Sequence, residues 1–270
     1  MIYFVHIPKT AGTTIREILR GIYGDRFAND TLETADDRMP SDAILNDLET
    51  HLADIDVYTA HMPFGLHEYL ARPYLYMTFV REPVSQNVSH YNFLLRAGGD
   101  FAAYFTEHGF DGYFSVNGVA WNNMQTRFLA GRDALFKPEL DDHDLQQAQH
   151  NLETEVDLLG LVEAFDESIV YFQHVLNWPA PFYLRVNQSS RYNHPKLITK
   201  SQLTPAQRAL VQARNQYDLA LYEFARSLFQ ARIAQLGDNF QRDVQRFKWQ
   251  NRLYYLWRVS RNKIRGILEH

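Results

Sequence analysis

The chain has 270 residues, of which 46% are hydrophobic and 22% are charged, and this composition excludes a largely disordered protein. It contains no Cys, which excludes disulfides, thiol nucleophiles and Cys-ligated metal sites. The formal net charge of −5 argues against a general nucleic-acid binder, so we expect no nucleic acid among its partners.

The first 24 residues predict a strand, a small loop and a helix. Ile2 to Ile7 is a short apolar run that is typical of a buried strand. Pro8 to Gly12 interrupts this run, and a helical pattern begins at Thr13 and ends at Gly24. This order of elements opens the phosphate-binding α/β folds. The segment lacks the basic and apolar regions of a signal peptide, which favours a cytoplasmic protein.

An anion site is predicted by the loop that reads His-Ile-Pro-Lys-Thr-Ala-Gly-Thr-Thr at positions 6–14. The N–H groups in the first turn of a helix have no partners within the helix and carry partial positive charge. Lys9 adds a full positive charge. The loop is not a Walker A motif, because Thr13 and not a lysine follows Gly12. We therefore expect a phosphate-like group here, without the arrangement that kinases use to hold Mg·ATP.

Two further strands are predicted in the first third of the chain, at 57–61 and 74–80. The first ends at His61, and the second is followed by Arg81. Open α/β sheets bind ligands at the carboxyl ends of their strands. Pro83 suits the first turn of the next helix, and Ser89 lies about two turns into it. An Arg and a Ser at these places can donate hydrogen bonds to phosphate oxygens.

The rest of the chain continues the alternation of helices and strands. Residues 100–137 form an aromatic segment, and its Tyr, Trp and Phe residues between Tyr104 and Trp121 form either a sugar-stacking wall or part of the core. The pattern predicts one α/β domain over residues 1–237, with a central, mostly parallel sheet of about five strands flanked by helices. The other expected elements are helices at 41–53, 141–155, 168–177 and 204–236, and strands at 158–162 and 182–186.

The cluster of Asp141, Asp142, His143 and Asp144 has the composition of a metal site. It lies where a helix is expected to begin, however, and acidic residues there interact favourably with the helix dipole. We expect helix capping at this cluster and no bound metal.

Residues 238–270 form a basic, aromatic C-terminal segment. Residues 239–270 contain eight Lys/Arg and two Asp/Glu, a net charge of +6, so the remaining chain carries −11. We expect a helical extension that packs on its own acidic body or on a second subunit in a homodimer. The alternative is contact with an anionic membrane surface, at the inner face of the membrane. Its apolar residues at largely helical spacing are Phe240, Val244, Phe247, Tyr254, Trp257 and Ile264.

The loop at 6–14 and the segment at 79–93 together resemble the signature of sulfotransferases that use 3′-phosphoadenosine 5′-phosphosulfate (PAPS). The two sequences are most similar to those of the carbohydrate branch that includes heparan sulfate 2-O-sulfotransferase. Segments at 123–129, 161–168 and 186–190 also look similar to that branch. This resemblance covers roughly residues 1–230. It implies a P-loop-like fold and transfer of a sulfuryl group to a hydroxyl of a saccharide or glycolipid. The product would be adenosine 3′,5′-bisphosphate, no metal would be required, and the apparent lack of a leader would point to a bacterial member.

The same resemblance implies roles for individual residues. Lys9 would neutralise the charge on the oxygen between phosphorus and sulfur as the nucleotide leaves. The other expected contacts are to the 5′-phosphate from Thr10, Gly12, Thr13 and Thr14, to the 3′-phosphate from Arg81 and Ser89, and to the adenosine and 3′-phosphate from Ser189, Ser190 and Arg191.

The catalytic base is expected to be His61, since the acceptor hydroxyl must lose its proton during transfer. The 2-O-sulfotransferases supply a catalytic His from a segment written HGHvxF. Residues 58–64 match the second His of this segment, whereas Thr59 replaces the first. We expect His6 to be structural, and His67 and His90 are less suitable candidates.

Two alternative functions stay open. One is a Mg-dependent, nucleotide-binding, kinase-like enzyme of related fold, and the missing Walker lysine argues against it. The other is a non-catalytic module that binds a glycan or a protein partner on the same fold. Such a module has no need for Lys9, Arg81, Ser89 and His61 together.

Overall fold

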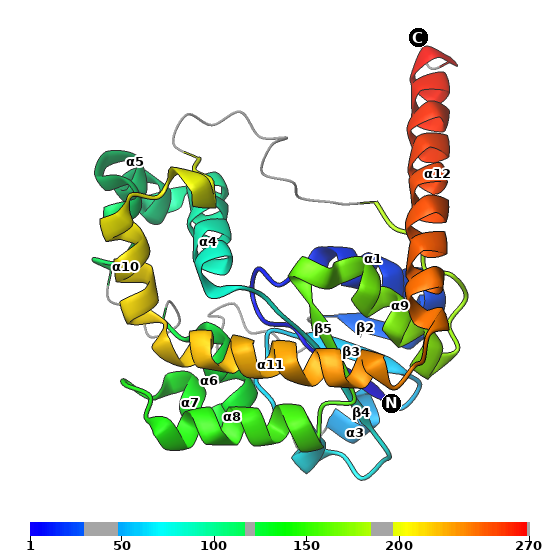
Figure 1. Cartoon of the computed structure of the whole chain (residues 1–270), viewed down its shortest axis with the longest axis horizontal. Helices are drawn as coiled ribbons and strands as arrows, with labels where there is room; N and C mark the ends of the chain where they lie inside the picture. The colour runs from blue at the N-terminus through cyan, green and yellow to red at the C-terminus, as the bar shows by residue number, and fades with distance from the viewer. Residues whose placement is uncertain (30–47, 117–121, 185–196, 269–270) are drawn as a thin grey trace.

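The computed structural model of the protein describes residues 1–29, 48–116, 122–184 and 197–268 (Figure 1). The expected nucleotide contacts Ser189, Ser190 and Arg191 lie outside these ranges. In the part of the chain that the structure describes, no helix is both long and apolar enough to cross a membrane.

A five-stranded sheet forms the centre of the molecule, in the order β2-β3-β1-β4-β5 (Figure 1). All four neighbouring pairs are parallel, which confirms the predicted α/β fold. The inner strands are buried on both faces, so their sequences are nearly continuous apolar runs. The strands are β1 (Ile2–Val5), β2 (Phe27–Asn29), β3 (Val57–Ala60), β4 (Leu75–Val80) and β5 (Leu158–Leu161).

One strand prediction is wrong. The described part of the expected strand at 182–186 is not a strand. The strand that the sequence did not predict is β2, which lies at the edge of the sheet beside β3. Phe182 instead stacks on Phe247 and Tyr254, with ring centroids 5.9 and 5.8 Å away. Its apolar side chain therefore packs on the C-terminal helix and not within a sheet. The edge strand β2 is only three half-buried residues long, so no apolar run marks it in the sequence.

Helices surround the sheet, and Figure 1 shows α1 and α9 on one side of it and α8 and α11 on the other. The expected helix at 204–236 is divided at Asn215, whose side-chain oxygen accepts the backbone N–H of Asn123 across 2.9 Å. The helices are α1 (Gly12–Tyr23), α3 (Leu48–His51), α4 (Pro83–Ala97), α5 (Gly99–Tyr113), α6 (Met124–Ala130), α7 (Arg132–Phe136), α8 (Asp142–Thr154), α9 (Phe165–Leu176), α10 (Pro205–Arg214), α11 (Gln216–Ala234) and α12 (Asn239–Leu268).

A second hydrophobic cluster joins α4, α5 and α10, which stand apart from the sheet in Figure 1. Its buried members from the aromatic segment are Phe105, Phe110, Tyr113 and Phe114. These side chains are therefore core residues and not a sugar-stacking wall. Because α4 begins shortly after β4, this second cluster fixes the helix that leads away from the carboxyl end of β4.

Candidate active site

The candidate site lies at the carboxyl ends of three adjacent strands. The anion loop, which we define as residues 6–11, follows β1; His61 follows β3; and Arg81 follows β4. The sheet order β3-β1-β4 and the parallel pairing bring these three points to one edge of the sheet. This is the edge at which open α/β sheets bind their ligands.

The backbone of the anion loop is strained. Lys9 and Ala11 both have a φ of 67°, in the left-handed region that residues other than glycine rarely adopt. Each such residue costs of order 1–3 kcal/mol and persists only where its surroundings hold it. Thr10 provides one such restraint, because its buried hydroxyl donates to the carbonyl of Ile7 across 2.8 Å. This hydroxyl therefore holds the turn and is already used within the loop.

Gly12 is required by the side chain of His6. A Cβ on residue 12 would overlap the His6 ring, which is 5% exposed. Burial, the neighbouring His61 and the cations Arg16 and Lys9 together hold the pKa of His6 well below its ordinary value. His6 is therefore a neutral ring that packs beneath the start of α1. This is the structural role that the sequence predicted.

Lys9 places its ammonium group against α4. Its Nζ lies 4.3 Å from the centroid of the Phe93 ring, which is 43% exposed. Burial, followed by the positive charges of Arg96 and Arg81, lowers the pKa of Lys9 to about 8. The two arginines thus repel the positive charge of Lys9, and a bound anion would stabilise this group of three cations.

Arg96 was not among the predicted site residues. It follows Ser89 and Phe93 at a spacing of seven and three residues, so all three lie on one face of α4. Ser89 is half-buried on that face. Arg96 is half-buried and donates from Nε to the carbonyl of Asn92 across 3.0 Å. The helical spacing from Ser89 is the sequence signal that could have identified it.

Arg81 links the second segment to the anion loop. Its Nη1 donates to the carbonyl of Lys9 across 3.0 Å, and the side-chain amide of Gln86 donates to the carbonyl of Pro8 across 2.9 Å. The Nε of Arg81 is buried and has no hydrogen-bond acceptor among the described residues. A buried donor without a partner costs about 1–3 kcal/mol. An anionic oxygen at this nitrogen would remove that cost.

The backbone of Arg81 is held by Gln125 of α6. The N–H of Arg81 donates to Gln125 Oε1 across 2.8 Å, and Gln125 Nε2 donates to the Arg81 carbonyl across 2.7 Å. The start of α6 is fixed by the buried carboxylate of Asp218, which accepts the N–H groups of Gln125 and Thr126 across 3.1 and 2.7 Å. The segment at 123–129 therefore supports the site by holding the backbone of Arg81.

His61 is exposed at the end of β3 and stacks on His6, with ring centroids 4.1 Å apart. Its Nδ1 lies 2.9 Å from the backbone carbonyl of His6. Because a carbonyl only accepts hydrogen bonds, Nδ1 carries the proton and Nε2 carries the lone pair of the neutral ring. Thr59, at the position of the missing first His, is buried in the sheet and donates to the carbonyl of Phe4 across 3.1 Å.

The other two candidate histidines occupy unsuitable places. His67 hydrogen-bonds through Nδ1 to the hydroxyl of Tyr76 across 2.8 Å and packs on Tyr74, at the start of β4 and away from Arg81. His90 is held by the hydroxyl of Tyr113, 2.9 Å from its Nδ1, and burial together with the charge of Lys9 lowers its pKa to about 4. His61 is the one of the three that combines exposure with a place at the carboxyl edge.

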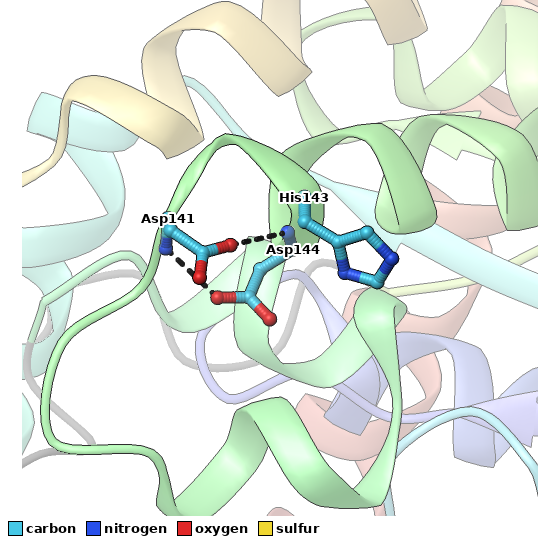
Figure 2. Close-up of side chains that lie close together, drawn as sticks. All are labelled: Asp141, His143 and Asp144. Carbon is cyan, nitrogen blue, oxygen red and sulfur yellow. Dashed lines mark hydrogen bonds between the residues drawn. The ribbon is translucent and has the colours of Figure 1, made fainter.

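The acidic cluster at the start of α8 is a helix cap (Figure 2). Asp141 accepts the N–H of Asp144 across 3.2 Å, and Asp144 accepts the N–H of Asp141 across 2.8 Å, which confirms the predicted capping. The Nζ of Lys137 lies 2.6 and 2.7 Å from the two carboxylates. An ammonium group of the protein therefore already pairs with both carboxylates, and Figure 2 draws no hydrogen bond from His143 to either of them.

Comparison with known proteins agrees with this geometry. The sequence model of a group described as the sulfotransferase family matches residues 1–225, which include the anion loop, His61, Arg81 and the whole sheet. A search of curated proteins found no match to this chain.

Proposed function

Because the chain belongs to the sulfotransferase family, we propose that it transfers the sulfuryl group of PAPS to a hydroxyl of a saccharide or glycolipid, with His61 as the general base. Membership of the family makes the protein a transferase of sulfuryl groups. The donor, the acceptor and the base are the parts that we propose.

The observation that carries the proposal is the group of cations around the anion loop. Burial and then the neighbouring charges of Arg96 and Arg81 lower the pKa of Lys9 to about 8, so the three cations lie close together. The Nε of Arg81 is a buried donor with no acceptor among the described residues. Both features fit a ligand that brings several negative charges, as PAPS does through its phosphosulfate and its 3′-phosphate. The first turn of α1 follows the loop directly and adds the partial positive charge of a helix N-terminus.

The residues divide the ligand between them as follows. Gly12, Thr13 and Thr14 at the start of α1 hold the 5′-phosphate, and Thr10 keeps the loop in shape from within. The 3′-phosphate binds Arg81 and Ser89. Ser189, Ser190 and Arg191 lie outside the described residues and stay proposed contacts to the adenosine and 3′-phosphate.

The chemistry requires a base and a counter-charge. When bound, PAPS supplies the sulfuryl group, whose sulfur gains a bond to the acceptor oxygen as it loses its bond to the phosphate oxygen. His61 takes the proton of the acceptor hydroxyl on Nε2, the nitrogen that carries the lone pair. Its stacking on the neutral ring of His6 leaves it next to an uncharged neighbour that can accommodate the new imidazolium. Lys9 neutralises the negative charge that grows on the leaving phosphate oxygen.

Support for a saccharide acceptor comes from the family resemblance and from Phe93. This exposed ring lies beside the Lys9 ammonium and presents a flat apolar surface next to the proposed point of transfer. Flat aromatic rings pack well against the apolar faces of sugars. No metal is needed in this scheme, because Lys9, Arg81 and the start of α1 supply the positive charge.

The test is calorimetry of adenosine 3′,5′-bisphosphate binding in the presence of EDTA, followed by incubation of the protein and a cell extract with PAPS labelled in its sulfur. We expect metal-independent binding of the bisphosphate and a labelled product whose mass identifies the acceptor. Binding that needs Mg²⁺ and prefers ATP would instead favour a kinase-like enzyme. Tight bisphosphate binding without turnover on a broad panel of acceptors would favour a non-catalytic module.

A further inference from the structure

Helix α12 has two apolar faces, on opposite sides. In its first half Phe240, Val244 and Phe247 are at most 3% exposed and belong to the main hydrophobic core. Successive residues of a helix are rotated by roughly 100°. Trp249 and Leu253 therefore point away from this packed face. The predicted helix is confirmed, and the two faces explain why its apolar residues do not form one continuous stripe.

The second face is exposed. It consists of Trp249, Leu253, Leu256 and Trp257, which are 62%, 46%, 52% and 52% exposed and which we call the outer stripe. Their spacing of four, seven and eight residues places them on one side of the helix. Figure 1 shows the later part of α12 extending beyond the body of the protein, so the body does not cover the stripe. Trp257, which was expected on the same face as Phe240, Val244 and Phe247, belongs to this outer stripe.

The charge around the outer stripe has one sign. Residues 244–268 contain seven Lys/Arg and no Asp/Glu. Arg252 and Arg261 lie on the two flanks of the stripe by helical spacing, and the Arg261 guanidinium lies 5.2 Å from the centroid of the Trp257 ring. Apolar and aromatic residues bordered by arginines form the pattern of a helix that lies in the plane of an anionic membrane surface. Trp in particular is enriched at the level of the lipid headgroups.

We propose that the outer stripe of α12 binds a membrane surface that carries anionic phospholipids. The helix lies in the plane of the interface, with Trp249, Leu253, Leu256 and Trp257 against the acyl boundary. Arg252 and Arg261 extend sideways to the lipid phosphates, as long basic side chains do at such boundaries.

A second copy of the chain fits the outer stripe less well. Pairing of two α12 helices would bring their arginines together without any carboxylate between residues 244 and 268. The acidic body offers charge complementarity, but its described surface has no matching apolar stripe. Its other exposed large apolar side chains lie singly on four different helices, and they are Phe93, Phe101, Phe136 and Val175.

The experiment is co-sedimentation of the full chain with vesicles of phosphatidylcholine alone or mixed with phosphatidylglycerol, with no nucleotide present. We expect binding to the mixed vesicles only, weaker binding at high salt, and a blue shift of the tryptophan emission. Trp249→Ser combined with Trp257→Ser should reduce partition by ~10-fold or more, since each ring loses its burial in lipid. Its melting temperature should be unchanged because both side chains are exposed.

The matched control is Phe136→Ser with Val175→Ser, which removes exposed apolar side chains elsewhere and should leave vesicle binding unchanged. Arg252→Glu with Arg261→Glu should abolish the preference for the mixed vesicles. Absence of binding by the full chain, or equal binding by the Trp249→Ser/Trp257→Ser variant, would overturn the proposal. A different result would also overturn it: the full chain forms a dimer in light scattering, the variant does not, and the full chain does not bind vesicles. The outer stripe would then bind a second copy of the chain. Nucleotide binding plays no part in the assay, so its outcome is independent of the proposed transferase chemistry.

Discussion

Arg81 donates a hydrogen bond from Nη1 to the backbone carbonyl of Lys9 across 3.0 Å. The residue that follows β4 therefore fixes the strained backbone of the residue that carries the positive charge of the anion loop. The two lie 72 positions apart in the chain. A substitution at Arg81 should consequently affect both the proposed binding of the 3′-phosphate and the position of Lys9.

Arg81→Ala should remove most of the preference for adenosine 3′,5′-bisphosphate over adenosine 5′-monophosphate. A hydrogen bond to a charged group contributes ~1.5–3 kcal/mol, so we expect the ratio of the two affinities to fall by ~10- to 100-fold. Calorimetry with both nucleotides measures this ratio. Ser89→Ala should act in the same direction with a smaller effect. The control is Arg226→Ala, an exposed arginine paired with Glu223, which should leave the ratio unchanged. An unchanged ratio in Arg81→Ala would remove this residue from the 3′-phosphate site.

Lys9→Ala should lower the transfer rate more than it weakens binding of the bisphosphate product. The charge that Lys9 meets grows as the bond from sulfur to the phosphate oxygen breaks, so its contribution is greatest in the transition state. We expect a loss of ~10²-fold or more in turnover. Single-turnover rates and product affinity, measured on the same preparation, give the comparison. Equal losses in the two quantities would make Lys9 a binding residue only.

The lowered pKa of Lys9 predicts a dependence of stability on pH. The folded, ligand-free protein releases this proton near pH 8, whereas the unfolded chain retains it up to the ordinary value of 10.5. The unfolded state therefore binds more protons between these values, and the free energy of unfolding should rise with pH across that window. We expect the melting temperature of the wild type to rise, relative to Lys9→Met, from about pH 8 to about pH 9.5. Parallel profiles would contradict the lowered pKa. The affinity for the bisphosphate should fall over the same range as Lys9 loses its charge.

Two glycines of α1 should respond in opposite ways to replacement by alanine. At Gly12 the new Cβ would overlap the His6 ring, so Gly12→Ala should destabilise the protein by about 1–3 kcal/mol and weaken bisphosphate binding. At Gly21 the Cβ meets nothing within 4 Å, so Gly21→Ala should stabilise α1 by about 0.5–1 kcal/mol and leave binding unchanged. Denaturant unfolding of the two variants tests this contrast. A neutral Gly12→Ala would show that His6 can move aside.

His61→Ala should leave bisphosphate affinity within a few-fold of the wild type and reduce turnover by ~10²–10⁴-fold, the usual contribution of a general base. The control is His67→Ala, because His67 contacts Tyr74 and Tyr76 near the start of β4. This control should retain most of its turnover once its folding has been verified by circular dichroism. Near-normal turnover in His61→Ala would assign the base to another group, with a carboxylate the next candidate.

The sequence by itself determined the class of fold and the residues of the anion loop. Both are local properties: apolar runs such as residues 74–80 predict strands, and the order of strand, small-residue loop and helix predicts a phosphate site wherever it occurs. The helix caps at Asp141 and Thr204 were predictable for the same reason, since each depends on a spacing of three residues.

The tertiary structure alone decided how the residues of the site contact one another. The contact from Arg81 to Lys9, the stacking of His61 on His6 and the effect of Arg96 on the pKa of Lys9 all join separate elements, and no spacing along the chain encodes them. The misplaced fifth strand has the same origin, because Phe182 could bury its ring against either a sheet or a helix. Burial of apolar surface has no direction, so the neighbours that three-dimensional packing supplies determine which of these is realised.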